Sequence, residues 1–201
     1  AMFCAGYHYA DQALEKRLEL RELESQPFEA VVYIRKINEL TEEGVKQQAV
    51  VLNRHDQLVN WLMYIKEKDH QPEAFVLGSY YRVYGTIKPA HSYAVQGVFD
   101  QEKWFLQQNL MSAFLVEQIV PLSQDEVYRL GHLKYLKEQD HFLEKIGLKI
   151  EIMRFEFRQT LAHSNLQHKG LLLALLTGDE SLLAKDLKKK FQQLGISHLL
   201  A

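Results

Sequence analysis

Tyrosines and basic residues recur between residues 27 and 121, where they could form a surface for single-stranded nucleic acid. Aromatic rings stack on unpaired bases, worth about 1–3 kcal/mol per base, while cations follow the phosphates. On the strands predicted below, the candidates would share the outer surface of a sheet. They are Tyr33, Arg35, Arg54, Tyr64, Lys66, Arg82 and Tyr84. The pattern is open to a structural interpretation, because tyrosine is frequent in strands whatever their function.

Acidic residues and histidines offer a second kind of chemistry. Asp179 and Glu180 could be paired carboxylates of a hydrolytic enzyme, but after Gly178 they also suit the start of a helix. None of the nine histidines lies in a metal-ligand pattern such as His-Glu-x-x-His, and the one cysteine, Cys4, excludes a Cys-rich zinc site. No phosphate-binding glycine loop or nucleophile elbow occurs either. We therefore predict no metal, no cofactor and no enzymatic activity.

A third candidate is the basic run 185–190, Lys-Asp-Leu-Lys-Lys-Lys, on a predicted helix. Such a run usually forms a solvated face, but it could contact anionic lipid or DNA phosphate. The chain as a whole has 24 Lys+Arg against 26 Asp+Glu, a net charge of −2. That balance excludes a generally basic nucleic-acid coat, so any polyanion contact must be a local patch. On the strand surface of residues 27–121, four nearby glutamates would repel phosphate, namely Glu39, Glu42, Glu43 and Glu67.

The elements that would position the candidates follow from the hydrophobic period, which is two between residues 27 and 121. Strands are predicted over 28–37, 45–54, 61–68, 79–87 and 112–120, with a hairpin turn at 41–44 and Pro121 ending the last strand. For 61–68 an amphipathic helix is the competing prediction. In the first strand, Ala30, Val32 and Ile34 would face inward. Five strands in about ninety-five residues predict a small barrel, of which the OB-fold is the commonest type.

Helical patterns flank this barrel. We predict helices over 11–25 and 103–109, and a capping box at Ser123 and Glu126 that begins a long helix ending or kinking at Gly147. Further helices are predicted over 149–163, 166–177 with Gly178 at the C′ position, and 184–194. The fold class is therefore α+β, a five-stranded OB-like barrel with an N-terminal helix and a C-terminal helical arm. The expected divisions are 1–26, 27–121 and 122–201.

Two stretches carry more distinctive motifs. The first, 85–116, contains Gly-Thr-Ile-Lys-Pro-Ala from Gly85, Gly-Val-Phe-Asp from Gly97 and Trp-Phe-Leu-Gln-Gln-Asn-Leu from Trp104. The second contains Leu-Leu-Leu-Ala-Leu-Leu-Thr-Gly-Asp from Leu171 and ends in Gly-Ile-Ser-His-Leu-Leu-Ala. Together they resemble the N-terminal soluble domain and the start of the competence region of ComEC-type DNA-internalisation proteins. Ala94-Val95-Gln96 and Glu180 depart from the family pattern, the latter where an arginine is usual.

The resemblance implies an inner-membrane protein of natural transformation that passes one DNA strand into the cytoplasm. This segment would be extracytoplasmic (periplasmic), with 1–26 following a membrane segment and 122–201 leading to the membrane channel region. Its partners would be single-stranded DNA, the channel portion of the same protein and other DNA-uptake components. The family's soluble domain is considered OB-like, and its nuclease-like domain has no counterpart in these 201 residues.

Three functional hypotheses remain open from the sequence. The first is a non-catalytic domain that binds or guides single-stranded DNA toward the channel. The second is a docking or assembly domain that binds no DNA, which the net charge of −2 favours. The third, from a different class, is a hydrolytic enzyme that uses Asp179, Glu180 or the histidines. It would require those side chains to meet in one cleft.

Overall fold

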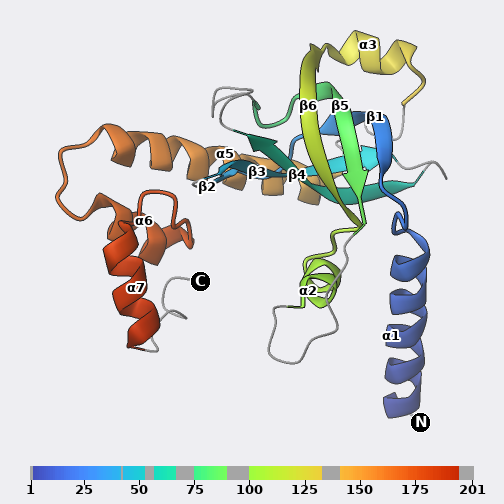
Figure 1. The fold of residues 1–201 in the computed structure, drawn as a ribbon, viewed down its shortest axis with the longest axis horizontal. Coiled ribbons are helices and arrows are strands. Elements are labelled where there is room, and N and C mark those ends of the chain that lie inside the picture. Colours follow the sequence, from blue (N-terminus) through green and yellow to red (C-terminus); the bar gives the residue numbers. More distant parts are fainter. Residues whose placement is uncertain are drawn as a thin grey trace.

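A computed structural model describes residues 2–41, 43–52, 57–66, 75–89, 100–132 and 141–194. Figure 1 shows a β-barrel with helices extending from it in different directions. In chain order the described elements are α1 (Met2–Glu19), β1 (Gln26–Tyr33), β2 (Glu39–Thr41), β3 (Gly44–Leu52), β4 (Leu58–Lys66), β5 (Tyr80–Lys88), α2 (Gln101–Gln107), β6 (Ser112–Leu122), α3 (Gln124–Arg129), α5 (Phe142–His163), α6 (Lys169–Thr177) and α7 (Lys185–Gln193).

The barrel confirms the predicted OB-like fold. The strands are ordered β1-β5-β6-β4-β3, and pairing of β1 with β3 closes the ring. The β4–β6 pair is parallel and the other pairs are antiparallel. A sixth short strand, β2, pairs antiparallel with β3, with Thr41 opposite Gly44. Strand structure over 58–66 confirms the prediction there and excludes the competing helix.

The barrel interior is apolar and is filled from every strand. Ala30, Val32 and Ile34 point into it, as predicted from the alternation. Trp61 lies at its centre, with its ring stacked on Phe114 at a centroid distance of 5.4 Å. Gly85 allows β5 to approach β6 closely, because a Cβ there would lie 1.9 Å from the Leu115 carbonyl oxygen. The core thus depends on strand alternation and on one position without a side chain.

Several strand ends differ from the sequence prediction, among them the start of β4 at Leu58 and the two ends described next. β1 ends at Tyr33, not at residue 37, so the segment 34–38 leaves the barrel as a loop. Pro121 does not end β6, which continues to Leu122 with Pro121 opposite Tyr81 of β5. The registered pairing of β6 with β4 covers only Ser112 to Leu115. Pro121 lies beyond the part of β6 that pairs with β4. A proline is tolerated there because its missing N–H is not needed for a hydrogen bond to a second strand.

Short helices cover parts of the outer barrel surface. Val127 of α3 is fully buried and packs with Tyr33, Val50 and Tyr80 on the outer side of β1, β3 and β5. Phe105 of α2 packs in the same way with other outer residues, which are Leu62, Leu110 and Ala113. The barrel therefore has covered outer patches as well as exposed ones.

The helical arm follows α3, whose predicted capping box is present: the Glu126 N–H donates to Ser123 Oγ, and the Ser123 N–H donates to Glu126 Oε2. Gly147 does not end a helix, since α5 continues through it to His163. Gly178 has a φ of 70° after α6 and confirms the predicted C′ position. The prediction that the capping box begins a long helix is wrong, because α3 ends at Arg129 and the next described helix, α5, begins at Phe142; residues 133–140 lie outside the described residues. The N-terminal helix also begins and ends earlier than predicted, at Met2 and Glu19.

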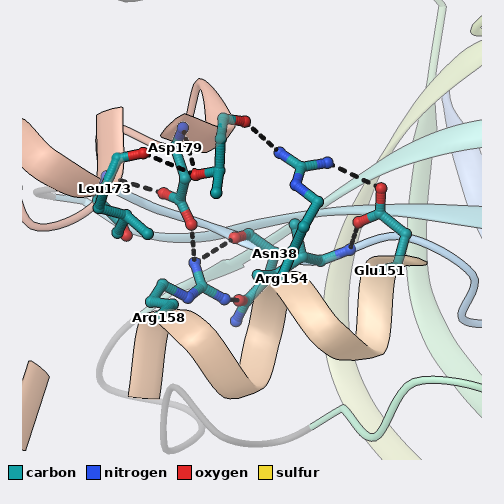
Figure 2. Close-up of polar contacts among 9 residues, drawn as sticks. Asn38, Glu151, Arg154, Arg158, Leu173 and Asp179 are labelled. Atoms are coloured by element: carbon teal, nitrogen blue, oxygen red, sulfur yellow. Dashed lines mark hydrogen bonds and ion pairs between the residues drawn. The ribbon is translucent and has the colours of Figure 1, made fainter. Parts of the chain in front are cut away.

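Polar side chains attach the arm to the barrel (Figure 2). Arg158 of α5 donates to the Asn38 carbonyl oxygen and to Asn38 Oδ1, and its Nη1 lies 3.3 Å from Asp179 Oδ2. Glu151 accepts the Ile37 N–H at 3.0 Å. Arg35 pairs with Glu144 at 2.6 Å. The loop 34–38 is therefore the main polar docking segment for α5.

Candidate nucleic-acid interface

The outer face of β3 and β4 carries a half-buried aromatic ring, Tyr64, between two lysines, and this ring also packs against the cluster around Leu62 and Phe105. Lys46 of β3 lies directly opposite Tyr64 of β4 in the antiparallel register. The Lys46 Nζ is 5.9 Å from the centroid of the Tyr64 ring, a cation–π distance. Lys66 follows Tyr64 on the same side of β4 and is exposed. We call Lys46, Tyr64 and Lys66 the β3–β4 face.

A polar pocket adjoins this face where three parts of the barrel meet. It has a volume of about 150 Å³ and is lined by the loop after β1 (Arg35, Lys36), by β3 and β4 (among them Gln48 and Asn60), and by Gln108 and Asn109 after α2. In OB-folds the faces of the second and third strands, with the loops after the first and fourth strands, bind oligonucleotides. The pocket is built from those same parts of the barrel.

The electrostatics of the surroundings are mixed. Glu39 of β2 lies opposite Lys46 in the register. Partial burial raises the pKa of Tyr64, and the Glu39 carboxylate raises that pKa further. Beside it lies a second hollow of about 470 Å³, between the barrel and the arm. Its lining has four cations (Lys36, Lys46, Arg154, Lys188) and four carboxylates (Glu39, Glu151, Asp179, Glu180), so it is formally neutral. The positive charge is local to the β3–β4 face and the loop 35–36.

Tyr33 cannot stack on a base, which corrects its prediction as an outer-surface residue. Alternation does place it on the outer side of β1, but its side chain is only 7% exposed. Its ring lies 5.2 Å from that of Tyr80, and Val127 of α3 packs on the same cluster. Burial raises the pKa of Tyr33, while Arg35 opposes that rise. The sequence pattern identified the correct side of the strand but gave no sign of the helix that covers it.

Arg82 and Tyr84 form a separate group on β5. In the closed ring, β5 is flanked by β1 and β6, which separate it from β3 and β4 on either side. Arg82 Nε lies 3.5 Å from Glu29 Oε1, and a hydrogen bond with Tyr84 is the main cause that raises the pKa of Arg82. These two residues therefore cannot act on one strand segment together with Tyr64. Arg54 lies outside the described residues.

The carboxylates considered for hydrolysis have structural partners. Asp179 pairs with Arg158 and accepts the Ser181 N–H at 2.9 Å, while Glu180 pairs with Lys188. The expectation that both begin the next helix is wrong, because α7 starts only at Lys185. Among the described residues, no three His, Cys, Asp or Glu side chains gather where they could hold a metal ion.

Four residues of the interface were missed from the sequence: Lys36, Lys46, Gln48 and Asn60. For three of them the alternation of inward and outward residues could have shown that they face outward. Lys46 and Gln48 alternate with Val45 and Ala49 in β3, and Asn60 alternates with Trp61 in β4. Lys36 fell within the predicted strand 28–37, on the side of Ile34 that would face inward, whereas β1 ends at Tyr33 and Lys36 lies on the loop that follows.

Comparison with known proteins adds no identification, since no protein-family model and no curated protein matches the chain. None of the helices in the described ranges is both long and apolar enough to span a bilayer.

Proposed function

We propose that the barrel binds single-stranded DNA on the β3–β4 face, with Lys36 contacting a phosphate that enters the adjoining pocket, while Arg35 remains paired with Glu144. The observation that carries this proposal is the position of Tyr64 beside Lys46 and Lys66 on the oligonucleotide-binding side of an OB-like barrel. The Tyr64 ring would stack on one base, while the lysines would neutralise the neighbouring phosphates. No covalent step is involved.

The motifs at 85–116 and 171–201 supply the biological setting of the proposal. By their resemblance to the ComEC family, the chain would be an extracytoplasmic, periplasmic segment of an inner-membrane DNA-uptake protein. Its barrel would receive or guide one strand toward the channel portion of that protein. The role would be non-catalytic, with reversible contacts that release the strand as it moves.

Few contacts imply weak, salt-sensitive binding. One stacked ring and about three phosphate contacts would give a salt slope of roughly −2, since each neutralised phosphate of a single strand contributes about −0.7. A transport domain requires such weak binding, because a strand held tightly would not proceed. We therefore expect a dissociation constant that is measurable only at low salt.

The experiment is fluorescence anisotropy of labelled oligonucleotides at low and moderate salt, in which Tyr64→Ala is compared with Tyr64→Phe and Tyr84→Ala. Tyr64→Ala should weaken binding about 5- to 100-fold, the range expected for one stacked base, while Tyr64→Phe retains the ring and the affinity. Tyr84→Ala is the control, because Tyr84 is equally half-buried but lies on β5. Lys46→Ala with Lys66→Ala should reduce the salt slope by about 1 to 2.

Equal effects of Tyr64→Ala and Tyr84→Ala, or absence of salt-dependent binding, would reject the β3–β4 face as a DNA site. The docking hypothesis would then be favoured, since the mixed charge around Glu39 suits a protein surface. Crosslinking from position 46 in the intact protein would distinguish the two, because a docking domain would capture protein and a guiding domain would capture DNA.

A further inference from the structure

The longest helix of the arm has a continuous exposed apolar side. Phe142, Leu143, Ile146, Ile150 and Met153 are all exposed, from 40% at Ile146 to 77% at Leu143. Monomeric proteins rarely expose so many large apolar residues together without a partner.

The other side of α5 explains why these residues remain exposed. That side attaches the helix through polar contacts of Glu144, Glu151 and Arg158 with the loop 34–38 and Asp179. It also carries apolar residues, because Leu148 lies against Gly78 and Leu161 is buried. An amphipathic helix normally directs one apolar stripe toward the core. Here a second apolar stripe lies outside the docked side, so it is available to something outside the chain.

The spacing of the stripe indicates another helix as the partner. Leu143, Ile146, Ile150, Met153 and the half-buried Phe157 follow one another at intervals of three, four, three and four residues. Alternating intervals of three and four are the a and d positions of a coiled coil, where knobs of one helix enter holes of the next. The seam is two heptads long, and it is narrower than the all-round apolar surface of a helix buried in a core.

Charges beside the seam indicate the identity and the direction of that helix. Lys149 and Glu156 both lie just before an a position, one heptad apart on the same edge, and both are exposed. In an antiparallel pair related by a two-fold axis, the edge that carries Lys149 and Glu156 lies beside the same edge of the second copy, which runs in the other direction. Lys149 then faces Glu156 of the second copy, and Glu156 faces its Lys149. A parallel pair would instead bring Lys149 near Arg154 of the second copy, which is unfavourable.

We infer that α5 is a self-association helix, through which two copies of this chain pair antiparallel along the seam Leu143, Ile146, Ile150, Met153 and Phe157. The same register places Ile150 against Met153 of the second copy, and Ile146 against its Phe157. Because the seam is short, the interface is small, and we expect half-association at a concentration on the order of tens of micromolar. This inference is independent of DNA binding.

Sedimentation velocity over a concentration series tests the pairing by charge exchange in the full chain. Lys149→Glu and Glu156→Lys should each weaken the dimer about tenfold, because each variant places like charges at both symmetric contacts. The double variant should recover the wild-type constant to within about threefold. Lys189→Glu on α7 is the matched control and should leave association unchanged.

A spin label attached to His163→Cys distinguishes antiparallel from parallel pairing. The background variant Cys4→Ser removes the one native cysteine, so that only position 163 is labelled. In the antiparallel register, His163 lies opposite Phe142 of the second copy. The two labels would then be separated by 21 residues of helix, about 30 Å at 1.5 Å per residue. A parallel pair would place the labels about 10–15 Å apart, near the helix–helix distance.

Ile150→Ser should abolish association, whereas Leu175→Ser, at an exposed apolar site on α6, should not. A wild-type chain that stays monomeric at all concentrations, or a double charge variant without recovery, would overturn the inference. It would also be overturned if the monomer co-sediments with vesicles containing anionic phosphatidylglycerol and Ile150→Ser removes that binding. The stripe would then be a surface for lipid and not for a second helix.

Discussion

The barrel and the helical arm differ in how much of their stability comes from charged contacts. In the barrel, alternate residues of each strand bury apolar side chains, with Trp61 and Phe114 stacked at the centre. In the arm, α5 contacts the barrel through charged groups, and the ion pair of Arg158 and Asp179 is almost fully desolvated, with side chains 5% and 11% exposed. The arm also buries Leu161, Leu173 and Ala174, so it combines a small apolar core with desolvated electrostatic contacts, whereas the barrel depends mainly on the hydrophobic effect.

This difference indicates how each region should respond to perturbation. Apolar burial is insensitive to the ionisation of individual groups, whereas a desolvated ion pair loses much of its value when one partner is neutralised. The arm should therefore be released without loss of the barrel, and a change in the barrel core should affect the whole molecule.

The largest effect is expected for Trp61→Ala. Removal of a fully buried ring at the barrel centre should lower the free energy of unfolding by about 3–5 kcal/mol. Urea unfolding followed by circular dichroism measures this loss. Trp61→Phe is the control, because it keeps a ring beside Phe114 and should cost clearly less. If Trp61→Ala unfolded only part of the barrel, the barrel would not be one cooperative unit.

Neutralising Asp179 should separate the two regions. Asp179→Asn keeps the side-chain volume but leaves Arg158 buried without its counter-charge, at a cost of about 3 kcal/mol. We expect hydrogen exchange to speed up in α6 and α7 while the amides of β3 and β4 stay protected. Glu180→Gln is the neighbouring control and should cost at most about 1 kcal/mol, because its pair with Lys188 is more exposed. Simultaneous loss of protection in β3 and α6 would contradict the separation.

The barrel was predictable from the sequence because alternation is a local signal. The period of two along 28–37, 45–54 and 61–68 reports directly which side of each strand is apolar, and five such strands restrict the fold to few solutions. The ends of strands depend on pairing with distant residues. Pro121 illustrates this, since its pairing with Tyr81 cannot be inferred from its neighbours.

The arm and the candidate site were less predictable for a related reason. Alternation shows which residues share a side of an element, but not what covers that side. Tyr33 was placed on the correct side of β1, yet Val127 of α3 buries it. On α5 the periodicity identifies an apolar stripe, yet the stripe faces outward because the polar side makes the contacts with residues 35–38. Gly147 ends nothing, since a single glycine within a helix costs only about 1 kcal/mol.

Alkaline pH should lower the stability of the folded state through the buried pair Tyr33 and Tyr80, which α3 covers. Burial raises the pKa of both Tyr33 and Tyr80, so the folded state keeps their protons at a pH where the unfolded chain has lost them. The resulting stability is complete below about pH 10, the ordinary pKa of tyrosine, and falls as the pH rises above it. Tyr33→Phe with Tyr80→Phe should flatten this fall in thermal melts from pH 9 to 11. The control Tyr64→Phe removes one half-buried phenol and not two, so it should flatten this fall less. Equal flattening by both would show that burial under α3 does not set the effect.

The smallest effect is expected at the cap that holds α3 over that pair. Ser123→Ala removes the acceptor for the Glu126 N–H and should cost about 1 kcal/mol, while Ser123→Asp should retain most of the stability. Because α3 belongs to neither the barrel core nor the docked face of α5, the loss should appear first as faster exchange at Val127 and greater exposure of Tyr33. Near-ultraviolet circular dichroism would detect the latter as a weaker tyrosine signal. If α3 only covers the barrel, the contacts of Arg158 in α5 should stay intact. Loss of exchange protection in α5 alone would therefore contradict this role and mean that α3 holds the arm in place.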